Sequence, residues 1–395
     1  MNPLNSSVLS IAPSATLAIS SRAKQMSAQG IRVANFSAGE PDFDTPAFIC
    51  RAAIEALNGG KTRYTPAAGV LALREAISEK LRRENGLEYD PSCIVVSCGA
   101  KHSLALAFQT LLNPGDEVLV PSPFWLSYPE MVKVAGGKAV FVPGSPENNL
   151  KITPADIERA ATPRSVAIVL NSPSNPSGIV YTRDELAGLA TTAIRHGMTI
   201  VSDEIYEKMV YDGCTATSVA SISPEIAERT ITVNGFSKAY AMTGWRLGYA
   251  AGPAPFATAM GALQSHCASA PNTFAQHAAI VALRDGAESI REMVAALDRR
   301  RQRLYELLCA IPGVTCVRPK GAFYALPDIS SFGLGSVDFA SRLLEEKHVA
   351  VVPGVAFGVD DRIRLSYACG IEEIERGTEL LAEFCASLRQ SAPSP

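Results

Sequence analysis

The sequence has no long apolar run and no excess of basic residues. None of its hydrophobic stretches approaches the ~18 consecutive apolar residues of a membrane span, and the net charge is −3, with 36 Lys and Arg residues scattered along the chain. Without a basic face, the chain offers no electrostatic footprint for a phosphodiester backbone or for anionic lipid. We therefore expect neither nucleic acid nor a membrane as a partner.

Metal-ligand motifs and disulfide patterns are also missing. The five histidines show no HExxH or comparable spacing, and the nine cysteines, an odd number, contain no CxxC pair. This usage predicts reduced, mostly buried thiols and no metal site. The first twenty residues lack a basic leader followed by an uninterrupted apolar block, so we expect a cytoplasmic protein.

Two nucleotide-binding motifs are incomplete. The segment "GGKT" at residues 59–62 resembles the end of a phosphate loop, but Glu55 stands where that loop needs its first glycine. No GxGxxG segment follows a predicted strand. The sequence therefore favours neither a nucleoside triphosphate nor a dinucleotide as ligand.

Short apolar runs do recur, separated in several places by helical patterns. Runs that are apolar throughout are typical of strands covered on both faces, and alternation with helices is typical of a mostly parallel sheet. We predict an α/β fold with a seven-stranded sheet flanked by helices. The seven runs, between about residues 93 and 252, are "CIVVSC", "DEVLVPSP", "KAVFVPG", "SVAIVLNSP", "MTIVSDE", "RTITVNG" and "RLGYAAG".

A second, smaller domain is predicted after this region. With 395 residues and 47% hydrophobic content, the chain is long enough for two domains. A long helical pattern over about residues 285–310 stops at "IPG", and a smaller α/β pattern follows. We expect residues 1–40 to form an N-terminal arm and part of the small domain, 41–285 a large domain, and 286–395 a small C-terminal domain.

Three polar segments follow predicted strands. They are "NSPSNPSG" (171–178), "SDEIY" (202–206) and a Ser-Lys pair at 237–238. Taken singly, the first is a plain turn, Asp203 is a helix cap and Lys238 is a solvated charge. Taken together they lie at the carboxyl edge of the predicted sheet, where ligands gather.

Pyridoxal phosphate needs all of these groups. Its ring aldehyde is tethered by a lysine imine and its ring nitrogen is kept protonated by a carboxylate, for which Asp203 is the candidate. Tyr206 and Asn175 can donate to the ring oxygen. The phosphate needs hydroxyls, an arginine and a helix start, for which Ser237, Arg246 and the turn "CGAKHS" are the candidates.

At this point the chain resembles the fold-type I, class I aminotransferases, in particular their bacterial aspartate aminotransferase branch. The resemblance covers nearly the whole chain, from "PSATLA", "AGEPDFDTP" and "RYTPAAG" through "NSPSNPSG", "SDEIYE" and "FSKAYAMTGWRLGYA" to "GAFYALPD" and "RLSYA". It implies the fold of a fold-type I pyridoxal-phosphate-dependent transferase, with a large cofactor domain and a smaller α/β domain. It also implies a homodimer with shared active sites.

The resemblance assigns roles to individual residues around the cofactor. Lys238 resembles the lysine that tethers the cofactor and later relays a proton at the substrate α-carbon. Trp125 resembles the aromatic that stacks on the ring, although its alternative interpretation is core packing. The other matches are Asp203 at the ring nitrogen, Tyr206 and Asn175 at the ring oxygen, and Ser237, Arg246 and the backbone of Ala100 and Lys101 at the phosphate.

Further matches concern the substrate and the partner subunit. Arg364 resembles the arginine that binds the substrate α-carboxylate, and the backbone of Gly39 would lie beside it. Arg362 would point to the same side of a strand, so only the family pattern favours Arg364. Tyr64 resembles a tyrosine that reaches the phosphate of the neighbouring subunit. Trp125 and Asn175 would also contact the substrate.

A second substrate carboxylate needs donors of its own, because an unpaired anion in a closed pocket is costly. The candidates are Lys101 and the hydroxyls of Ser14 and Thr16. The alternative interpretations are a solvated helix-end charge for Lys101 and a helix cap for Ser14 and Thr16. Ala12 stands where some relatives carry a lysine that can meet a second acidic group, which weakens the case for prephenate.

The resemblance implies transfer of the amino group of L-aspartate to 2-oxoglutarate, giving oxaloacetate and L-glutamate. Another class I reaction on the same scaffold, with aromatic, alanine or aspartate/prephenate substrates, is the first alternative, since one fold hosts many activities. A non-catalytic relative that binds the cofactor or an amino acid is the second. Retention of every chemical residue, Lys238 included, argues against that second alternative.

Overall fold

The computed structural model describes residues 4, 9–11 and 15–391. Its largest element is a seven-stranded sheet of order β2-β8-β7-β6-β5-β3-β4, in which β8 alone runs opposite to the other six strands. Each strand coincides with one of the seven predicted runs, so the mostly parallel sheet is confirmed. The strands are β2 Ile94–Ser97, β3 Glu117–Ser122, β4 Lys138–Pro143, β5 Ser165–Asn171, β6 Thr199–Asp203, β7 Thr230–Gly235 and β8 Gly248–Ala251.

One strand differs from the prediction that both faces are covered. β4 lies at the edge of the sheet and pairs only with β3. Most of its side chains are exposed or half-buried, and Phe141 is 52% exposed. An apolar run indicates a strand, but it does not show whether the strand has neighbours on both sides.

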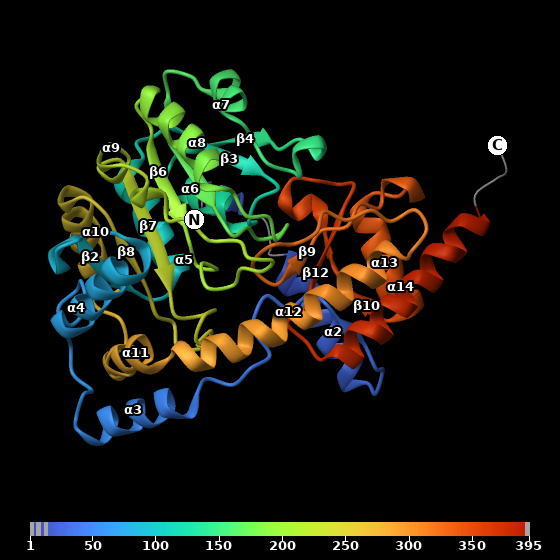
Figure 1. The fold of residues 1–395 in the computed structure, drawn as a ribbon, viewed down its shortest axis with the longest axis horizontal. Helices are drawn as coiled ribbons and strands as arrows, with labels where there is room; N and C mark the ends of the chain where they lie inside the picture. Colours follow the sequence, from blue (N-terminus) through green and yellow to red (C-terminus); the bar gives the residue numbers. More distant parts are fainter. Residues whose placement is uncertain (1–3, 5–8, 12–14, 392–395) are drawn as a thin grey trace.

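Helices cover both faces of this sheet (Figure 1). Val169, Val201 and Val233 pack with the helices α5, α6 and α10, whereas Ile168 and Ile200 pack with α7 and α8 on the opposite face. This alternation follows from the two-residue period of a strand. The helices around the sheet are α3 Ala47–Asn58, α4 Leu71–Lys80, α5 Ala100–Leu111, α6 Ser127–Val134, α7 Pro154–Ala160, α8 Arg183–Arg195, α9 Pro224–Ala227, α10 Ala254–Cys267 and α11 Thr273–Asp285.

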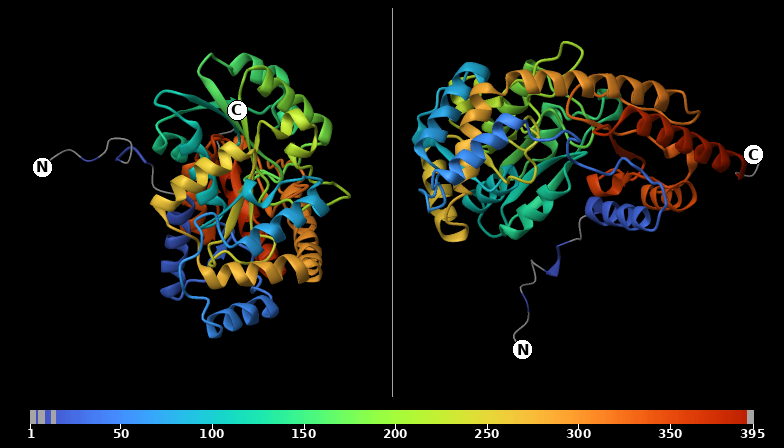
Figure 2. Two further views of the ribbon diagram at one scale, coloured as in Figure 1. Left: turned by 90° about the vertical axis from the view of Figure 1, so that its left-hand side faces the viewer. Right: turned by 90° about the horizontal axis from the view of Figure 1, so that it is seen from below.

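A second group of elements comes from both ends of the chain. β1 (Ala34–Asn35) pairs in parallel with β10 (Val349–Ala350), and β11 (Val352–Pro353), β12 (Ile363–Ser366) and β9 (Tyr324–Ala325) form a three-stranded antiparallel sheet. α2 packs against β10 and β11 (Figure 2). The helices of this group are α2 Ala15–Ala28, α12 Ala287–Cys309, α13 Ser336–Lys347 and α14 Ile371–Ser391.

One apolar core holds Phe36 together with Phe323, Phe339, Leu365 and Phe384, and it also includes Ile205, Tyr206, Met209 and Tyr211 from the segment after β6. α12 begins beside α11 and extends toward α13 and α14 (Figure 1). The N-terminal segment and the C-terminal elements thus share one core.

The thiols correct another prediction. All nine cysteines are unpaired, but only Cys385 is buried, while Cys267 and Cys309 are exposed and the other six are half-buried. The expectation of mostly buried thiols is therefore wrong.

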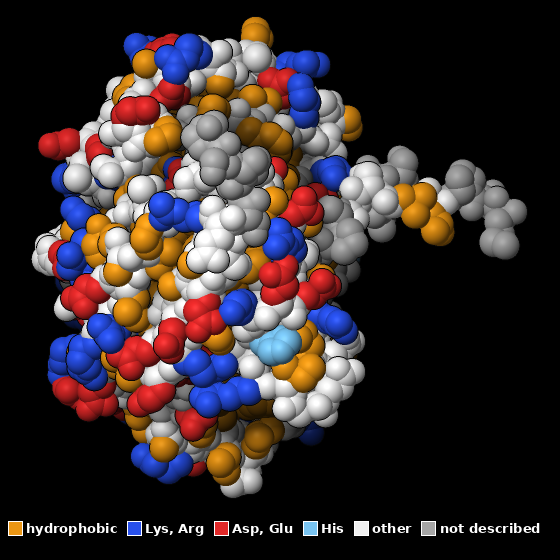
Figure 3. Space-filling model, turned by 90° about the vertical axis from the view of Figure 1, so that its right-hand side faces the viewer, with side chains coloured by type: hydrophobic (Ala, Val, Ile, Leu, Met, Phe, Trp, Pro, Cys, Tyr) orange, Lys and Arg blue, Asp and Glu red, His pale blue; other side chains and the backbone are white. Residues whose placement is uncertain are grey.

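Charges of both signs are interspersed on the face shown in Figure 3. Within the described residues, no helix combines the length and apolarity that a bilayer crossing needs. The same part of the chain holds no group of three or more His, Cys, Asp or Glu side chains placed to bind a metal ion.

Candidate active site

A cavity of about 350 Å³ lies at the carboxyl ends of the parallel strands. Asp203 ends β6, Ser237 and Lys238 follow β7, and Ala100 begins α5. The parallel strands bring these segments, distant in sequence, to one edge of the sheet. The predicted residues that line the cavity are Gly39, Ala100, Lys101, Trp125, Asn175, Asp203, Tyr206, Ser237, Lys238, Arg246 and Arg364.

Asp203 presents a buried carboxyl group to this cavity. The Tyr128 hydroxyl donates to its Oδ2 at 2.7 Å, and the backbone N–H of Ile205 donates to its Oδ1 at 3.3 Å. Burial raises the pKa of the Asp203 carboxyl to about 6, although the Tyr128 hydrogen bond lowers it. The next helical element after β6 begins only at Val219, so Asp203 is no helix cap. A buried carboxylate of this kind gains most from a cationic ligand atom.

Lys238 brings a buried amine to the same cavity. Its Nζ donates to the backbone oxygen of Gly39 and lies 5.7 Å from the ring centroid of Phe323. Burial lowers the pKa of the Lys238 amine to about 8, while the Glu40 charge opposes this and the Arg364 charge adds to it. Far more of this amine is uncharged near neutral pH than in an exposed lysine, so it can act as a nucleophile or a base.

The start of α5 forms an anion-binding corner. Gly99 precedes the helix at a φ of 90°, which favours glycine. A Cβ at Gly248 would lie 2.3 Å from the backbone nitrogen of Ala100, so β8 approaches the helix start this closely only because residue 248 is glycine. The first N–H groups of a helix have no intrahelical acceptor. With Ser237 and Arg246 in the same cavity wall, they make a site suited to a phosphate.

Tyr206 and Asn175 supply neutral polar groups. The Tyr206 hydroxyl shares a 3.0 Å hydrogen bond with the Tyr324 hydroxyl. The Asn175 side-chain oxygen accepts from Arg364 Nη1 at 3.1 Å. This bond orients the Asn175 amide so that its NH₂ group is left to donate to a ligand.

The two arginines at β12 have different surroundings. Arg362 Nη2 donates to the Asp328 carboxylate at 2.8 Å, and Arg362 does not line the cavity. Arg364 lines it, is 2% exposed, and donates through Nη2 to the Ser37 backbone oxygen at 2.9 Å. Its Nε has no hydrogen-bond partner. A buried guanidinium with an unused donor is suited to bind a carboxylate ligand.

The remaining predicted residues lie at the rim or beyond it. Lys101 Nζ lies 4.9 Å from the ring centroid of Trp125, and burial lowers the pKa of the Lys101 amine. Tyr64 is 94% exposed and lies outside the cavity. Ser14 lies outside the described residues, and Thr16 belongs to α2 with a side chain that the structure does not describe.

Sequence reasoning missed two tyrosines of the cavity. Tyr128 contacts Asp203 and also packs edge-on against Trp125, with ring centroids 5.3 Å apart. The Tyr324 ring centroid lies 4.5 Å from Arg364 Cζ. Both tyrosines stand in segments already quoted, "PSPFWLSYPE" and "GAFYALPD", but only the fold shows which partners they meet.

Comparison with known proteins identifies the family. The family model described as aminotransferase class I and II matches residues 31–381. The aspartate aminotransferase of Geobacillus stearothermophilus is 48% identical over 382 residues, which cover 95% of this chain and 97% of that protein. The aspartate/prephenate aminotransferase of Cereibacter sphaeroides is 45% identical, with 98% of this chain and 99% of that protein covered.

A solved structure gives the same result. The Thermus thermophilus aspartate aminotransferase with maleate superposes with a TM-score of 0.93 at 45% identity, covering 97% of this chain and 100% of that chain. The family match spans most of the sequence, and the relatives match it over nearly their full length. The chain therefore belongs to the class I and II aminotransferase family.

Proposed function

We propose that this aminotransferase uses pyridoxal phosphate to move the amino group of L-aspartate to 2-oxoglutarate, giving oxaloacetate and L-glutamate. The observation that carries the proposal is that Lys238, Asp203 and Arg364 line one cavity. An amine of lowered pKa, a buried carboxyl and a guanidinium with an unused donor are the groups that this cofactor and an amino acid require.

The donor set of the cavity fits the cofactor. The close approach of Gly248 to Ala100 shapes the corner where the helix start, Ser237 and Arg246 would hold the phosphate. The other residues that would hold it are Lys238 at the aldehyde, Asp203 at the ring nitrogen, Tyr206 and the Asn175 amide at the ring oxygen, and Trp125 against the ring face.

When bound, pyridoxal phosphate withdraws electrons from the bonds of the substrate α-carbon. The negative charge of Asp203 keeps a proton on the ring nitrogen. Lys238 Nζ takes the proton from the α-carbon, a task that its pKa of about 8 suits near neutral pH. Arg364 binds the substrate α-carboxylate and so orients the carbon toward that amine.

Lys101 supports the choice of a dicarboxylic substrate. Lys101 lies at the rim beside Trp125, and burial lowers the pKa of its amine, so an anion placed there would favour the charged form of that amine. The structural relative from Thermus thermophilus was solved with maleate, a four-carbon dicarboxylate like aspartate. A lysine is a point charge without the fork of an arginine, so we expect some activity with neutral or aromatic donors.

Prephenate is the second candidate substrate. The relative from Cereibacter sphaeroides, named an aspartate/prephenate aminotransferase, favours it. Ala12, which argues against it, lies outside the described residues.

The proposal includes a homodimer with shared sites. Tyr64 is 94% exposed, as expected of a side chain that reaches the phosphate of a neighbouring subunit.

The proposal also includes the division of the chain into an arm at 1–40, a large domain at 41–285 and a small domain at 286–395. The core that both chain ends share supports this division. The nine unpaired cysteines support a location in the cytoplasm, where thiols stay reduced.

A panel of amino donors tests the proposed reaction. Purified protein loaded with pyridoxal phosphate is assayed with aspartate, alanine and phenylalanine against 2-oxoglutarate, with glutamate against oxaloacetate, and with prephenate as an alternative acceptor for aspartate. We expect kcat/KM for aspartate to exceed that for alanine by about tenfold or more. A preference for a neutral donor would contradict the aspartate assignment. A cofactor colour that responds to no amino or keto acid would identify a non-catalytic relative.

A further inference from the structure

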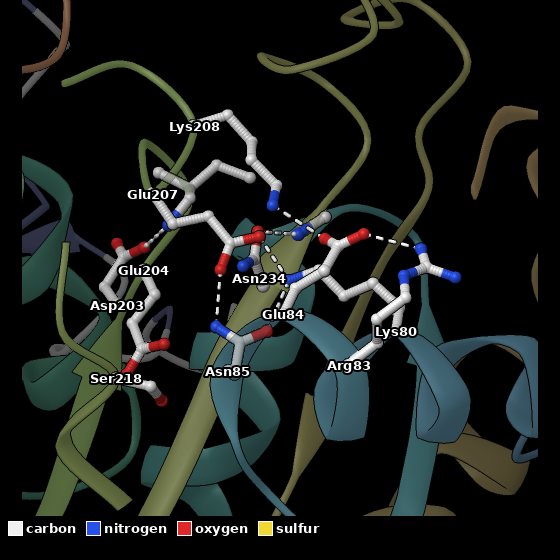
Figure 4. A network of polar contacts seen from close by, with 12 residues as sticks. Lys80, Arg83, Glu84, Asn85, Asp203, Glu204, Glu207, Lys208, Ser218 and Asn234 are labelled. Carbon is white, nitrogen blue, oxygen red and sulfur yellow. Dashed lines mark hydrogen bonds and ion pairs between the residues drawn. The ribbon is translucent and has the colours of Figure 1, made fainter. Parts of the chain in front are cut away.

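The segment after β6 presents side chains to two sides. Asp203 and Tyr206 line the cavity. Glu204 and Glu207 point away from it, Glu204 toward Ser218 and Glu207 toward the end of α4 (Figure 4). The proposed mechanism uses the first pair and leaves the role of the second pair open.

Glu207 belongs to a closed ring of hydrogen bonds. Lys80 Nζ donates to Glu207 Oε1 and, at 2.8 Å, to Asn85 Oδ1. Asn85 Nδ2 donates to Glu207 Oε2 at 2.7 Å. Each carboxylate oxygen therefore has its own directed donor, which fixes both the place and the rotation of the carboxylate.

A π-helical turn brings the two donors together. α4 ends at Lys80 and continues into the π turn Leu81–Asn85, where the Gly86 N–H donates to the Leu81 carbonyl five residues earlier. Lys80 and Asn85 are themselves five residues apart, and the wider turn places both beside Glu207 (Figure 4). Such turns are rare and are often found near functional sites.

Stability alone does not account for this ion pair. The side chains of Lys80 and Glu207 are only 3% and 11% exposed. Burial would raise the pKa of the Glu207 carboxyl, but the charges of Lys80 and Lys208 and the hydrogen bonds from Lys80 and Asn85 together hold that pKa below its usual value. Replacing a buried ion pair by apolar side chains of similar volume is often neutral or stabilising, so the directed geometry of the ion pair is the feature that needs an explanation.

Glu204 and Lys208 also fix the segment 203–208 on the side that faces away from the cavity. The Lys208 ammonium pairs with the Glu84 carboxylate at 2.6 Å. Glu204 Oε1 accepts from the hydroxyls of Ser202 and Ser218 at 2.7 and 2.9 Å, and from the Val219 N–H at 3.1 Å. The segment between the two cavity residues thus has little freedom to shift.

We propose that Lys80, Asn85 and Glu207 are positioning residues. They hold the segment 203–208 on the side away from the cavity, so that Asp203 and Tyr206 keep their places in it. Glu207 is the direct neighbour of Tyr206, and the Met209 N–H donates to the Tyr206 carbonyl at 2.8 Å, so a shift of Glu207 moves the Tyr206 backbone. The consequence for turnover rests on the proposed function.

The test separates geometry from stability. Lys80→Met leaves the buried Glu207 carboxylate without its ion-pair partner, and it should lower both the thermal midpoint and kcat. The double variant Lys80→Met/Glu207→Leu removes both charges and should recover the thermal midpoint. We expect the double variant still to lose about tenfold or more in kcat, with KM for aspartate nearly unchanged, because small misplacements at a site are costly. The pH midpoint of the bound cofactor's colour change should also move.

Lys151→Met is the matched control. Lys151 forms an ion pair with Glu185, at 2.7 Å, that is more exposed than the Lys80–Glu207 pair and has no partner in the segment 203–208. It should change neither kcat nor the colour midpoint. A double variant with wild-type kcat and colour midpoint would overturn the positioning role.

A second readout does not depend on the proposed reaction. In protein without cofactor, hydrogen exchange of the backbone amides of residues 203–209 should be about tenfold faster in the double variant than in the wild type or Lys151→Met. Unchanged exchange would contradict the inference even if transamination is confirmed. A wild-type protein that fails to transaminate would refute the proposed function and leave the exchange result to decide the inference.

Discussion

The cavity has a buried end and an open rim, and the two differ in how this chain builds them. At the buried end, Asp203 and Lys238 follow neighbouring parallel strands, and both have pKa values displaced by burial. At the rim, Lys101 faces Trp125 at the start of α5, while Tyr64 is 94% exposed and does not line this cavity.

This difference separates the chemistry from the choice of substrate. The buried end is fixed by sheet topology, so any chain with this fold and these residues presents the same reactive groups. The rim depends on surface side chains and on the proposed second subunit. Changes at the buried end should therefore abolish turnover, whereas changes at the rim should alter substrate preference or dimer dependence.

Apart from the complete loss of turnover expected when Lys238 is replaced, the largest effect is expected at Asp203. Asp203→Asn should fold and bind coloured cofactor, but an amide cannot keep the ring nitrogen protonated. We expect kcat to fall by a factor on the order of 10²–10³, with a smaller change in KM. Steady-state kinetics with aspartate measure this. Near-normal turnover would show that the Asp203 carboxylate is not needed for the reaction.

At the rim, Lys101→Ser should act on one class of substrate. Loss of a charged hydrogen bond of roughly 1.5–3 kcal/mol should raise KM for aspartate by about one to two orders of magnitude. KM for alanine or phenylalanine should barely change. Equal losses for charged and neutral donors would remove Lys101 from substrate recognition and place it on the phosphate side.

Mixing two impaired proteins tests whether the rim is shared between subunits. Tyr64→Ala should weaken cofactor binding in the neighbouring site, and Lys238→Ala should abolish turnover in its own. After random subunit exchange, hybrid dimers should restore about a quarter of the native sites. The recovered activity is read against each variant alone. Full wild-type activity in a monomer, established by sedimentation at assay concentration, would contradict the shared rim.

The smallest effect is expected at Glu204, which is buried next to Asp203 but outside the cavity. Burial raises the pKa of its carboxyl from 4.5 to about 7. The folded state thus holds this proton more tightly than the unfolded state, so the carboxyl destabilises the protein increasingly as pH rises from about 4.5 to about 7.

Glu204→Gln removes this dependence. In thermal unfolding of cofactor-free protein, its midpoint relative to the wild type should rise by a few degrees between pH 5 and pH 8, with kcat within about threefold. A pH-independent difference would show that Glu204 titrates normally. A kcat loss as large as that of Asp203→Asn would erase the distinction between the two carboxyls.

The sequence predicts the reactive groups of the cavity better than the side chains that pack around them. The seven apolar runs locate the strands, and strand ends that carry Asp203 and Lys238 must meet at one sheet edge, so these positions follow from local patterns and topology. The contacts of Tyr128 and Tyr324 do not, because they depend on how side chains from distant segments pack. Local patterns also do not show which strand lies at an edge, which misled the prediction for β4.

Arg362 and Arg364 illustrate the same limit. Alternation along a strand places both on one side. Only the tertiary structure shows that Asp328 binds Arg362 outside the cavity. The family pattern favoured Arg364, and the structure places it in the cavity wall.

Chemical trapping of the cofactor tests the central claim most directly. Borohydride reduction of the loaded protein, followed by digestion and peptide mapping, fixes the cofactor to the lysine that holds it. The account predicts the pyridoxyl group on Lys238, at the buried end of the cavity. A label on Lys101 at the rim, or no label at all, would contradict it.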